Sequence, residues 1–248
     1  MEAIRLQTWY DTPLGRTAVR MVGLSMERWL RIQPSQRTLG FGYPQPYLDR
    51  LRPWIGPVLG ASPAEMGVAR WPGSANNRIA LVRPDALPFP DESFDRVMMT
   101  HLLEGVQCPR TTLRETWRVL VPGGRVLVMV PNRGGLWARR DVTPFGWGRP
   151  FSPQQLKITL EESLFLTRQS CFALFFPPLE GKRWLKAAPA WEKAGERWFA
   201  PLGGVILCEA EKIMYAVAPK DTNGRIRSPH RWLAMPVGNN RDSGSNVD

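Results

Sequence analysis

Short apolar runs, each bounded by glycine, proline or polar residues, follow one another along the chain. The clearest is Arg125–Val130, a continuous valine-rich run of the kind that forms a strand covered on both faces of a parallel sheet. Phe94–Thr100 is a second strongly apolar run and also predicts a strand. Weaker runs predict further strands at residues 37–43, 57–61, 79–82, 170–176 and 205–218.

Apolar residues at helical spacing alternate with these strands. Within residues 13–32, Leu14, Ala18, Val22 and Met26 recur at every fourth position, which predicts an amphipathic helix that packs on the rest of the domain. Similar patterns predict helices at residues 47–54, 111–120, 152–163 and 182–199, and a helix or turn at 63–68.

The boundaries of two helices are marked by specific residues. Val121–Gly124, a Val-Pro-Gly-Gly sequence, is expected to end the helix before it, and Ser152 is expected to cap the helix after it. Strands that alternate with helices, and finish as two close strands, predict an α/β fold. Its core would be a doubly wound, mostly parallel sheet with an antiparallel end.

The apolar segments continue to residue 218, which predicts one principal domain over residues 1–218. Residues 219–248 are rich in Pro, Asn, Gly, Ser and Arg and predict a flexible tail, with contact to an acidic partner as the alternative. No apolar run approaches the ~20 residues that cross a bilayer. The 3 cysteines are far apart and predict neither a disulfide framework nor a zinc site. We therefore expect a cytoplasmic protein without a metal site.

The chain has 33 basic and 22 acidic residues and a formal net charge of +11. A positive field of this size favours encounters with an anionic substrate, a nucleic acid or an acidic membrane surface. The alternative is a solvated basic surface without a specific partner, because the arginines are spread along the chain.

Five motifs occur in order within residues 36–130. They are Gly40-Phe41-Gly42-Tyr43-Pro44, Gly60–Met66, Asp85–Phe89, Phe94–Val97 continuing into Thr100–Glu104, and Leu120–Leu127. In this order they resemble the class I S-adenosylmethionine-dependent methyltransferases, in particular the small-molecule, ubiquinone/menaquinone-methylase-like group. The resemblance implies a Rossmann-like sheet of seven strands, S-adenosylmethionine as cofactor and methyl transfer to a small molecule. Residues 131–151 and Val205–Lys212 also resemble a bacterial subgroup of methyltransferase-domain proteins, which implies no particular substrate.

Ligands of such sheets bind beyond the carboxyl ends of the strands, so the turns after the first four strands are expected to form the cofactor site. Gly40, Phe41 and Gly42 would approach the methionine part, because glycine adopts conformations closed to other residues. A simple tight turn is the alternative. Asp85 is a candidate acceptor for the adenine amino group, with loop capping as its alternative. The remaining cofactor candidates are Ser62, Ala86, Leu87 and Thr100.

Two positions depart from the pattern of that group. A ribose is usually held by a carboxylate at the end of the second strand, because two carboxylate oxygens match two neighbouring hydroxyls, whereas this chain has Ser62 there. Glu65 is the candidate substitute, unless it faces water. Pro44 replaces the third glycine of the turn and removes an amide donor. These departures leave open a degenerate, non-catalytic methyltransferase fold that serves as a binding or regulatory module.

His101 directly follows the fourth predicted strand and is one of 2 histidines in the chain. Because imidazole titrates near neutral pH, His101 is the candidate general base for a hydroxyl acceptor. Glu104 is the candidate that orients His101 or binds the substrate, and loop capping is the alternative for both residues.

Residues 131–151 combine aromatic rings with guanidinium groups. Such a segment suits an anionic or aromatic acceptor, or a lid over it, and packing on the core is the alternative. The acceptor-side candidates are Asn132, Arg133, Trp137, Arg140, Phe145 and Trp147.

The sequence therefore predicts a cytoplasmic methyltransferase that uses S-adenosylmethionine and acts on an unidentified acceptor. Residues 1–35 are expected to pack over the sheet, residues 36–130 to hold the cofactor and residues 131–205 to form the acceptor side. The rival hypotheses are the non-catalytic module and an RNA-associated protein, the latter suggested by the net charge and the tryptophans. The oligomeric state stays open.

Overall fold

The computed structural model describes residues 2–28, 35–51, 56–72 and 77–214. Four predictions therefore lie partly or wholly outside the described residues. These are the last part of the helix 13–32, the helix end at Trp54, the last residues of the strand 205–218, and the tail 219–248.

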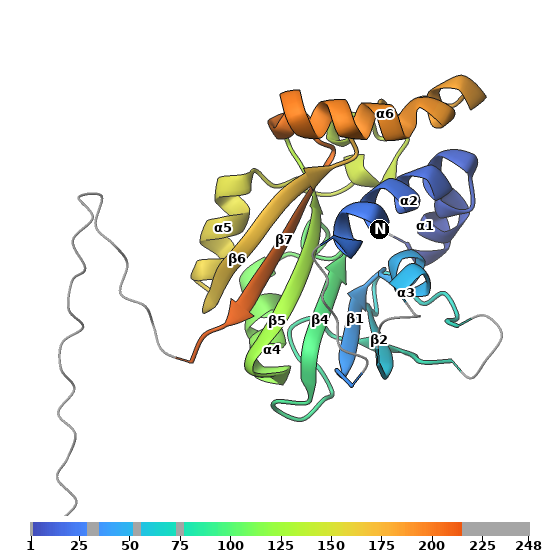
Figure 1. Ribbon diagram of the computed structural model, residues 1–248. Helices are drawn as coiled ribbons and strands as arrows, with labels where there is room; N and C mark the ends of the chain where they lie inside the picture. The colour runs from blue at the N-terminus through green and yellow to red at the C-terminus, as the bar shows by residue number, and fades with distance from the viewer. Residues whose placement is uncertain (1, 29–34, 52–55, 73–76, 215–248) are drawn as a thin grey trace, which may run out of the picture. The chain divides into compact units, whose positions relative to one another are not determined.

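Seven strands within the described residues form one sheet, in the order β3-β2-β1-β4-β5-β7-β6 (Figure 1). Neighbouring strands from β3 through β5 are parallel, whereas β7 lies antiparallel between β5 and β6. This arrangement confirms the predicted mostly parallel, Rossmann-like sheet with an antiparallel end. The strands are β1 (Thr38–Gly42), β2 (Val58–Pro63), β3 (Ile79–Val82), β4 (Phe94–Thr100), β5 (Leu120–Pro131), β6 (Phe165–Ala173) and β7 (Val205–Lys212).

Helices cover both faces of the sheet. Successive residues of a strand point to opposite faces, so each face contributes to a separate hydrophobic core. On one face, Met98 and Leu127 belong to a core that includes residues of α1, α2 and α6. On the other, Val97 and Val126 belong to a core with Leu113 of α4 and further residues of α4 and α5. The helices are α1 (Ala3–Tyr10), α2 (Pro13–Glu27), α3 (Gln45–Leu51), α4 (Pro109–Val119), α5 (Pro153–Glu161) and α6 (Lys182–Trp198). In the part of the chain that the structure describes, none of the helices is both long enough and apolar enough to span a bilayer.

Several predicted boundaries are confirmed, and others are wrong. The strands at 79–82 and 94–100 match β3 and β4, and Ser152 caps α5 through a reciprocal pair of hydrogen bonds with Gln155. The single helix predicted from residue 13 is preceded by a separate helix, α1, and α2 ends at Glu27. Strand β6 begins at Phe165 and not at residue 170.

The Val-Pro-Gly-Gly sequence does not stop the preceding helix, since it lies inside β5. Leu120 already has extended backbone angles (φ −80°, ψ 140°), so α4 ends before the sequence begins. The pairing of β4 with β5 shifts register between Phe94 and Arg96, and Gly123 adopts a φ of +70°. The glycines thus accommodate an irregularity at the start of a strand.

The carboxyl ends of β1 and β4 are joined directly. The Tyr43 amide donates to the Thr100 carbonyl at 2.8 Å. Gly42 has a φ of +91°, and a Cβ built on it would lie 2.3 Å from the Thr100 carbonyl oxygen. Only glycine permits both the angle and this close approach, so the simple tight turn, the alternative that the sequence left open, is present.

Candidate functional site

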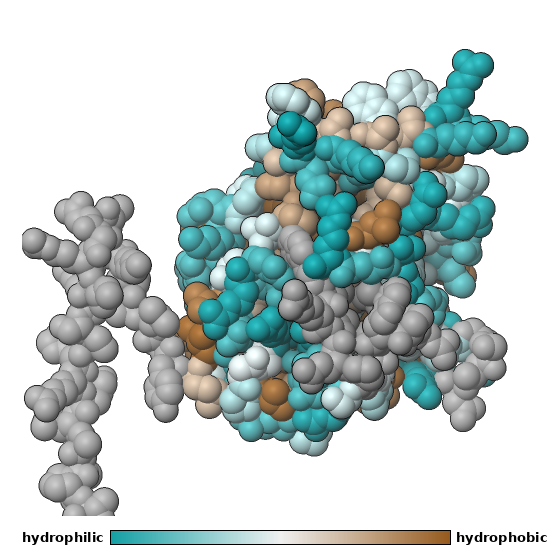
Figure 2. Space-filling view, in the orientation of Figure 1, coloured by the Kyte–Doolittle hydropathy of each residue, from teal (hydrophilic) through white to brown (hydrophobic). Residues whose placement is uncertain are grey.

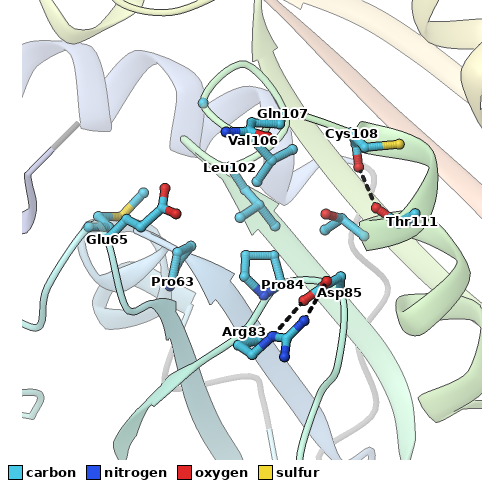
Figure 3. Close-up of a pocket in the computed structure, with 13 residues that line it drawn as sticks. Pro63, Glu65, Arg83, Pro84, Asp85, Leu102, Val106, Gln107, Cys108 and Thr111 are labelled. Carbon is cyan, nitrogen blue, oxygen red and sulfur yellow. Dashed lines mark hydrogen bonds and ion pairs between the residues drawn. The ribbon is translucent and has the colours of Figure 1, made fainter.

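A cavity of about 380 Å³ opens at the carboxyl ends of β2, β3 and β4 (Figure 3). Its size falls within the range of about 300–1,000 Å³ that is typical of small-molecule sites. The turns that were predicted near residues 62, 85 and 100 bring their neighbouring residues to it. Its walls include Pro63, Glu65, Met66, Pro84, Asp85, Leu102, Gly105, Val106, Gln107, Cys108 and Thr111.

Two carboxylates lie on opposite sides of the cavity. Glu65 is exposed and lines one side, and Asp85 lines the other, with Leu102 and Val106 between them (Figure 3). Asp85 accepts a two-point hydrogen bond from Arg83, at 3.1 and 2.9 Å. This hydrogen bond lowers the pKa of Asp85 below its ordinary value, so Asp85 remains an ionised acceptor. Acceptors on both sides and apolar side chains between them suit a flat ligand that carries hydroxyl or amino groups.

Ala86 and Leu87, the residues after Asp85, stabilise the loop and do not line the cavity. The Leu87 amide donates to Glu115 at 2.9 Å, and the Leu87 side chain is buried. Ala86 is exposed and closes a small bridge with Arg83. In this arrangement neither residue lines the cavity, and of the three loop candidates only Asp85 does.

Ser62, at the usual ribose position, is fully buried. Its hydroxyl donates to the Gly67 carbonyl at 2.6 Å and fastens the turn after β2. That turn carries Glu65, so Ser62 positions the loop while Glu65 reaches the cavity. Glu65 thus lines the cavity, and its role as a substitute for a carboxylate at position 62 stays a prediction.

A cavity of about 340 Å³ is lined by Tyr10 and Tyr43, but Gly40, Phe41 and Gly42 of the glycine turn do not line it. A Cβ on Gly40 would lie 2.7 Å from atoms of both Leu48 and Pro44, and the Phe41 side chain is fully buried in the core. Thr100 is likewise fully buried, with a hydroxyl that has no hydrogen-bond partner among the described residues. These four cofactor candidates, Gly40, Phe41, Gly42 and Thr100, lie together, but the described structure packs its own side chains around them.

Tyr10 of α1 fills the space between this turn and the end of β4. Its ring stacks on Tyr43 at a centroid distance of 5.9 Å, and its hydroxyl lies 2.6 Å from Nε2 of His101 and 3.2 Å from the Tyr47 hydroxyl. Burial raises the pKa of Tyr10 well above its ordinary value, so the phenol stays neutral and can donate. The amino-acid end of the predicted cofactor site is thus closed by an aromatic cluster.

His101 and Glu104 are in contact, which is one of the arrangements that the sequence left open. Nδ1 of His101 lies 3.2 Å from a Glu104 carboxylate oxygen, and both side chains are buried. His101 has a φ of +52°, which is uncommon for a residue with a side chain. One consistent set of bonds has His101 donating from Nδ1 to Glu104 and accepting at Nε2 from Tyr10. The other carboxylate oxygen of Glu104 is buried and has no hydrogen-bond partner in the part of the chain that the structure describes. In this arrangement the pair is linked to Tyr10 and is shielded from solvent.

Three of the acceptor-side candidates belong to the core. Asn132 donates to the carbonyls of Pro201 and Gly203 at 2.8 and 2.7 Å. Trp137 and Phe145 are fully buried, and Trp137 donates to the Phe176 carbonyl. These residues fix the segment 131–151 to the sheet, which is the packing alternative that the sequence left open.

The other three acceptor-side candidates lie nearer the surface. Trp147 lines a second cavity of about 320 Å³ with Glu104 and Arg149, and the Arg5 guanidinium lies 4.5 Å from its ring centroid. Arg133 lines a third cavity of about 310 Å³, and Arg140 is exposed. Val106 lines the first, second and third cavities, so these hollows surround the loop after β4.

The sequence reasoning missed two features of the site. Tyr10 was missed because α1 was, although Ala3, Leu6 and Tyr10 are buried at helical spacing. Cys108 was treated only as a distant cysteine, yet it lines the first cavity. Hydrogen bonding from the Thr111 backbone lowers the pKa of the Cys108 thiol.

Comparison with known proteins agrees with this geometry. Residues 39–128 match the family model described as a methyltransferase domain. The chain is 44% identical over 66 residues to the demethylmenaquinone methyltransferase of Clavibacter sepedonicus, covering 26% of each chain. It is 53% identical over 45 residues to a ubiquinone/menaquinone biosynthesis C-methyltransferase of Hahella chejuensis, covering 18% of each. The matches thus span about a quarter or less of these relatives.

The fold as a whole is shared with solved structures. A structure from Thermotoga maritima, titled a methyltransferase dependent on S-adenosylmethionine and a possible histamine N-methyltransferase, superimposes with a TM-score of 0.61. The identity is 20%, over 85% of this chain and 95% of that chain, and at this identity the likeness concerns the fold. The chain is therefore similar to the class I S-adenosylmethionine-dependent methyltransferases of the ubiquinone/menaquinone-methylase-like type, and residues 39–128 carry the match to their methyltransferase domain.

Proposed function

We propose that this protein is a methyltransferase that uses S-adenosylmethionine and acts on a small-molecule acceptor. The observation that carries the proposal is the cavity between Glu65 and Asp85, which lies at the carboxyl ends of β2, β3 and β4 and is built largely from residues that match the methyltransferase domain. This is the edge at which ligands of such sheets bind.

The residues present fit the nucleoside half of the cofactor. Glu65 would accept from the ribose hydroxyls and Asp85 from the adenine amino group, while Leu102 and Val106 cover the faces of the base. When bound, S-adenosylmethionine supplies a methyl group activated by a sulfonium. Positioning supplies much of the acceleration in such a transfer, so the chain needs few reactive groups of its own.

The amino-acid half does not fit in the arrangement described. Tyr10 and Tyr43 are stacked beside the glycine turn, and Tyr10 is bonded to His101. Binding of the complete cofactor therefore requires the Tyr10 ring, and with it the end of α1, to move. Once Tyr10 leaves, Nε2 of His101 is free to accept a proton from a hydroxyl acceptor, with Glu104 holding the ring in place.

Calorimetric titration with S-adenosylhomocysteine tests the proposal. The full chain should bind this product analogue, and Glu65→Gln should raise the dissociation constant about tenfold, because one charge-assisted hydrogen bond is lost. Glu180→Gln is the matched control, since Glu180 is an exposed carboxylate that does not line the cavity. Absence of binding at millimolar ligand would remove the enzyme hypothesis.

The closed amino-acid end favours a second candidate function, a non-catalytic module that binds nucleosides through the open cavity alone. Adenosine distinguishes the two functions. The methyltransferase should bind S-adenosylhomocysteine much more tightly than adenosine, because the amino-acid half adds contacts. The module should bind both ligands with equal affinity.

A further inference from the structure

Helix α6 presents a row of tryptophans to solvent. Trp184, Trp191 and Trp198 are each seven residues apart, which is two helical turns, so they lie on one side of the helix. Their exposed fractions are 43%, 42% and 70%. Phe199 and Leu202, just beyond the helix, are also more than half exposed, at 57% and 52%. These large apolar side chains form an exposed strip along α6 and its C-terminal end.

Basic residues outnumber acidic residues on α6. The helix has five basic residues, Lys182, Arg183, Lys186, Lys193 and Arg197. None of them forms an ion pair among the described residues. Its two carboxylates are both engaged with the fold. Glu192 accepts from the amides of the segment 174–176, and Glu196 pairs with Arg28 at 2.8 Å. The positive charge of the helix therefore stands uncompensated at the surface.

A groove between α2 and α6 adds to this charge. It has a volume of about 550 Å³ and is lined by Arg16, Arg20, Lys182 and Lys186 together with the apolar Leu185 and Pro189. None of these four basic side chains has a carboxylate partner within the part of the chain that the structure describes. Four cations that line one hollow are suited to anionic groups such as phosphates.

The strip and the groove occupy one end of the sheet. Pro131 and Ala173 both pair with Val205, so the ends of β5 and β6 meet the start of β7, and α6 connects β6 to β7 at this level. Figure 1 shows α6 lying across this end. Hydrophilic side chains, drawn in teal, stand out among pale and brown atoms over this end in Figure 2. Tryptophans flank one side of α6 and the groove flanks the other. A surface that meets both must therefore embed the exposed outer face of the helix between them, at Arg183, Ala190 and Arg197.

We propose that this face docks on an anionic phospholipid membrane. Lipid phosphates would occupy the groove between α2 and α6, and Trp198 and Phe199 would enter the interface between headgroups and acyl chains. A helix with basic residues on its outer face and tryptophans along its flank has the composition of one that lies in the membrane plane. Tryptophan also concentrates at membrane interfaces because its ring is apolar with one polar edge.

The observations favour a membrane over a nucleic acid as the occupant. Nucleic-acid phosphates would satisfy the groove, but hydrated backbone and ribose give Phe199 and Leu202 no apolar surroundings. A membrane interface buries these side chains and neutralises the cations at the same time. The docking surface involves neither Glu65 nor His101, so it goes beyond the proposed function and can be tested without it.

Co-sedimentation with vesicles tests this proposal on the full chain. The protein should bind vesicles that contain equal amounts of phosphatidylglycerol and phosphatidylcholine, and it should not bind pure phosphatidylcholine. Each basic residue near an anionic surface contributes about fivefold to the partition coefficient. The triple variant Arg16→Gln, Arg20→Gln, Lys186→Gln should therefore bind about 100-fold more weakly.

The matched control is the triple variant Arg78→Gln, Arg114→Gln, Lys157→Gln. It has the same net charge and removes exposed cations from other elements. It should bind as wild type does. The double variant Trp198→Ser, Phe199→Ser should weaken binding several-fold while keeping the dependence on phosphatidylglycerol, and Leu81→Ser controls for loss of exposed apolar surface.

Three results would overturn the proposal. The first is absence of binding to the anionic vesicles, and the second is an equal loss in the two triple variants. The third is tight, salt-dependent binding to a tRNA mixture without any partition onto vesicles, which would assign the face to nucleic acid.

Discussion

Replacing Tyr10 by phenylalanine probes the contact that closes the amino-acid end of the site. The change removes one oxygen atom, which in the structure bonds Nε2 of His101 at 2.6 Å and the Tyr47 hydroxyl at 3.2 Å. Both groups are buried, and leaving a buried polar group unsatisfied costs about 1–3 kcal/mol. The ring keeps its stacking on Tyr43, so little apolar contact is lost.

We expect Tyr10→Phe to lower the free energy of unfolding by about 2 kcal/mol. In a domain of this size each kcal/mol corresponds to a Tm lower by about 2–4 °C, so differential scanning fluorimetry should record a decrease of about 4–8 °C. Tyr43→Phe is the matched control. Tyr43 has a buried ring, but its hydroxyl makes no hydrogen bond with the described residues. The control should lie within about 0.5 kcal/mol of wild type.

The same variant tests whether closure opposes cofactor binding. If the Tyr10 bonds stabilise only the closed arrangement, weakening them raises the population of the open one. Tyr10→Phe should then bind S-adenosylhomocysteine up to about tenfold more tightly, and its affinity for adenosine should not change. Equal effects of Tyr10→Phe and Tyr43→Phe on Tm, or a parallel change in the affinities for both ligands, would refute the reasoning.

Three further predictions concern the cavity and the turn beside it. Gly42→Ala should destabilise the fold by about 1–3 kcal/mol in chemical denaturation, because φ is +91° and the added methyl meets the Thr100 carbonyl. Gly67→Ala is the control that separates this clash from backbone strain, because Gly67 has a φ of +76° but open space beside it. Cys108 should be alkylated by iodoacetamide before Cys171 and Cys208 when followed by mass spectrometry, because burial raises the pKa of those two thiols to about 12 and about 11 while the pKa of the exposed Cys108 thiol is lowered. S-adenosylhomocysteine should slow that alkylation, since Cys108 lines the cavity, and unchanged labelling at saturating ligand would place the ligand elsewhere.

Local sequence patterns predicted the elements that are continuous and apolar. Phe94–Thr100 was predicted at both ends because a buried central strand leaves few polar residues within it. The predicted start of β5 was wrong because Pro-Gly-Gly favours a turn. In the structure the glycines lie within the strand, next to a register shift against β4 that the local sequence does not indicate. The helix α1 is short and separated from α2 by a two-residue turn, so its few apolar positions did not indicate a separate helix.

The sequence predicted those parts of the site that short sequence motifs specify. Glu65 and Asp85 line the cavity, and the contact between His101 and Glu104 spans three residues. Tyr10 meets His101 across 91 positions, which no local pattern specifies. The burial of Trp137 and Phe145 likewise depends on α1 and on the segment after β6, so the sequence left their role open between acceptor binding and packing.

A crystal structure of the full chain with S-adenosylhomocysteine tests the central claim most directly. The account predicts the adenosine part between Glu65 and Asp85, over Leu102 and Val106, and Tyr10 displaced from His101 so that the amino-acid part reaches the turn at Gly42. A ligand bound away from the carboxyl ends of β2, β3 and β4, or an empty cavity at saturating ligand, would contradict it.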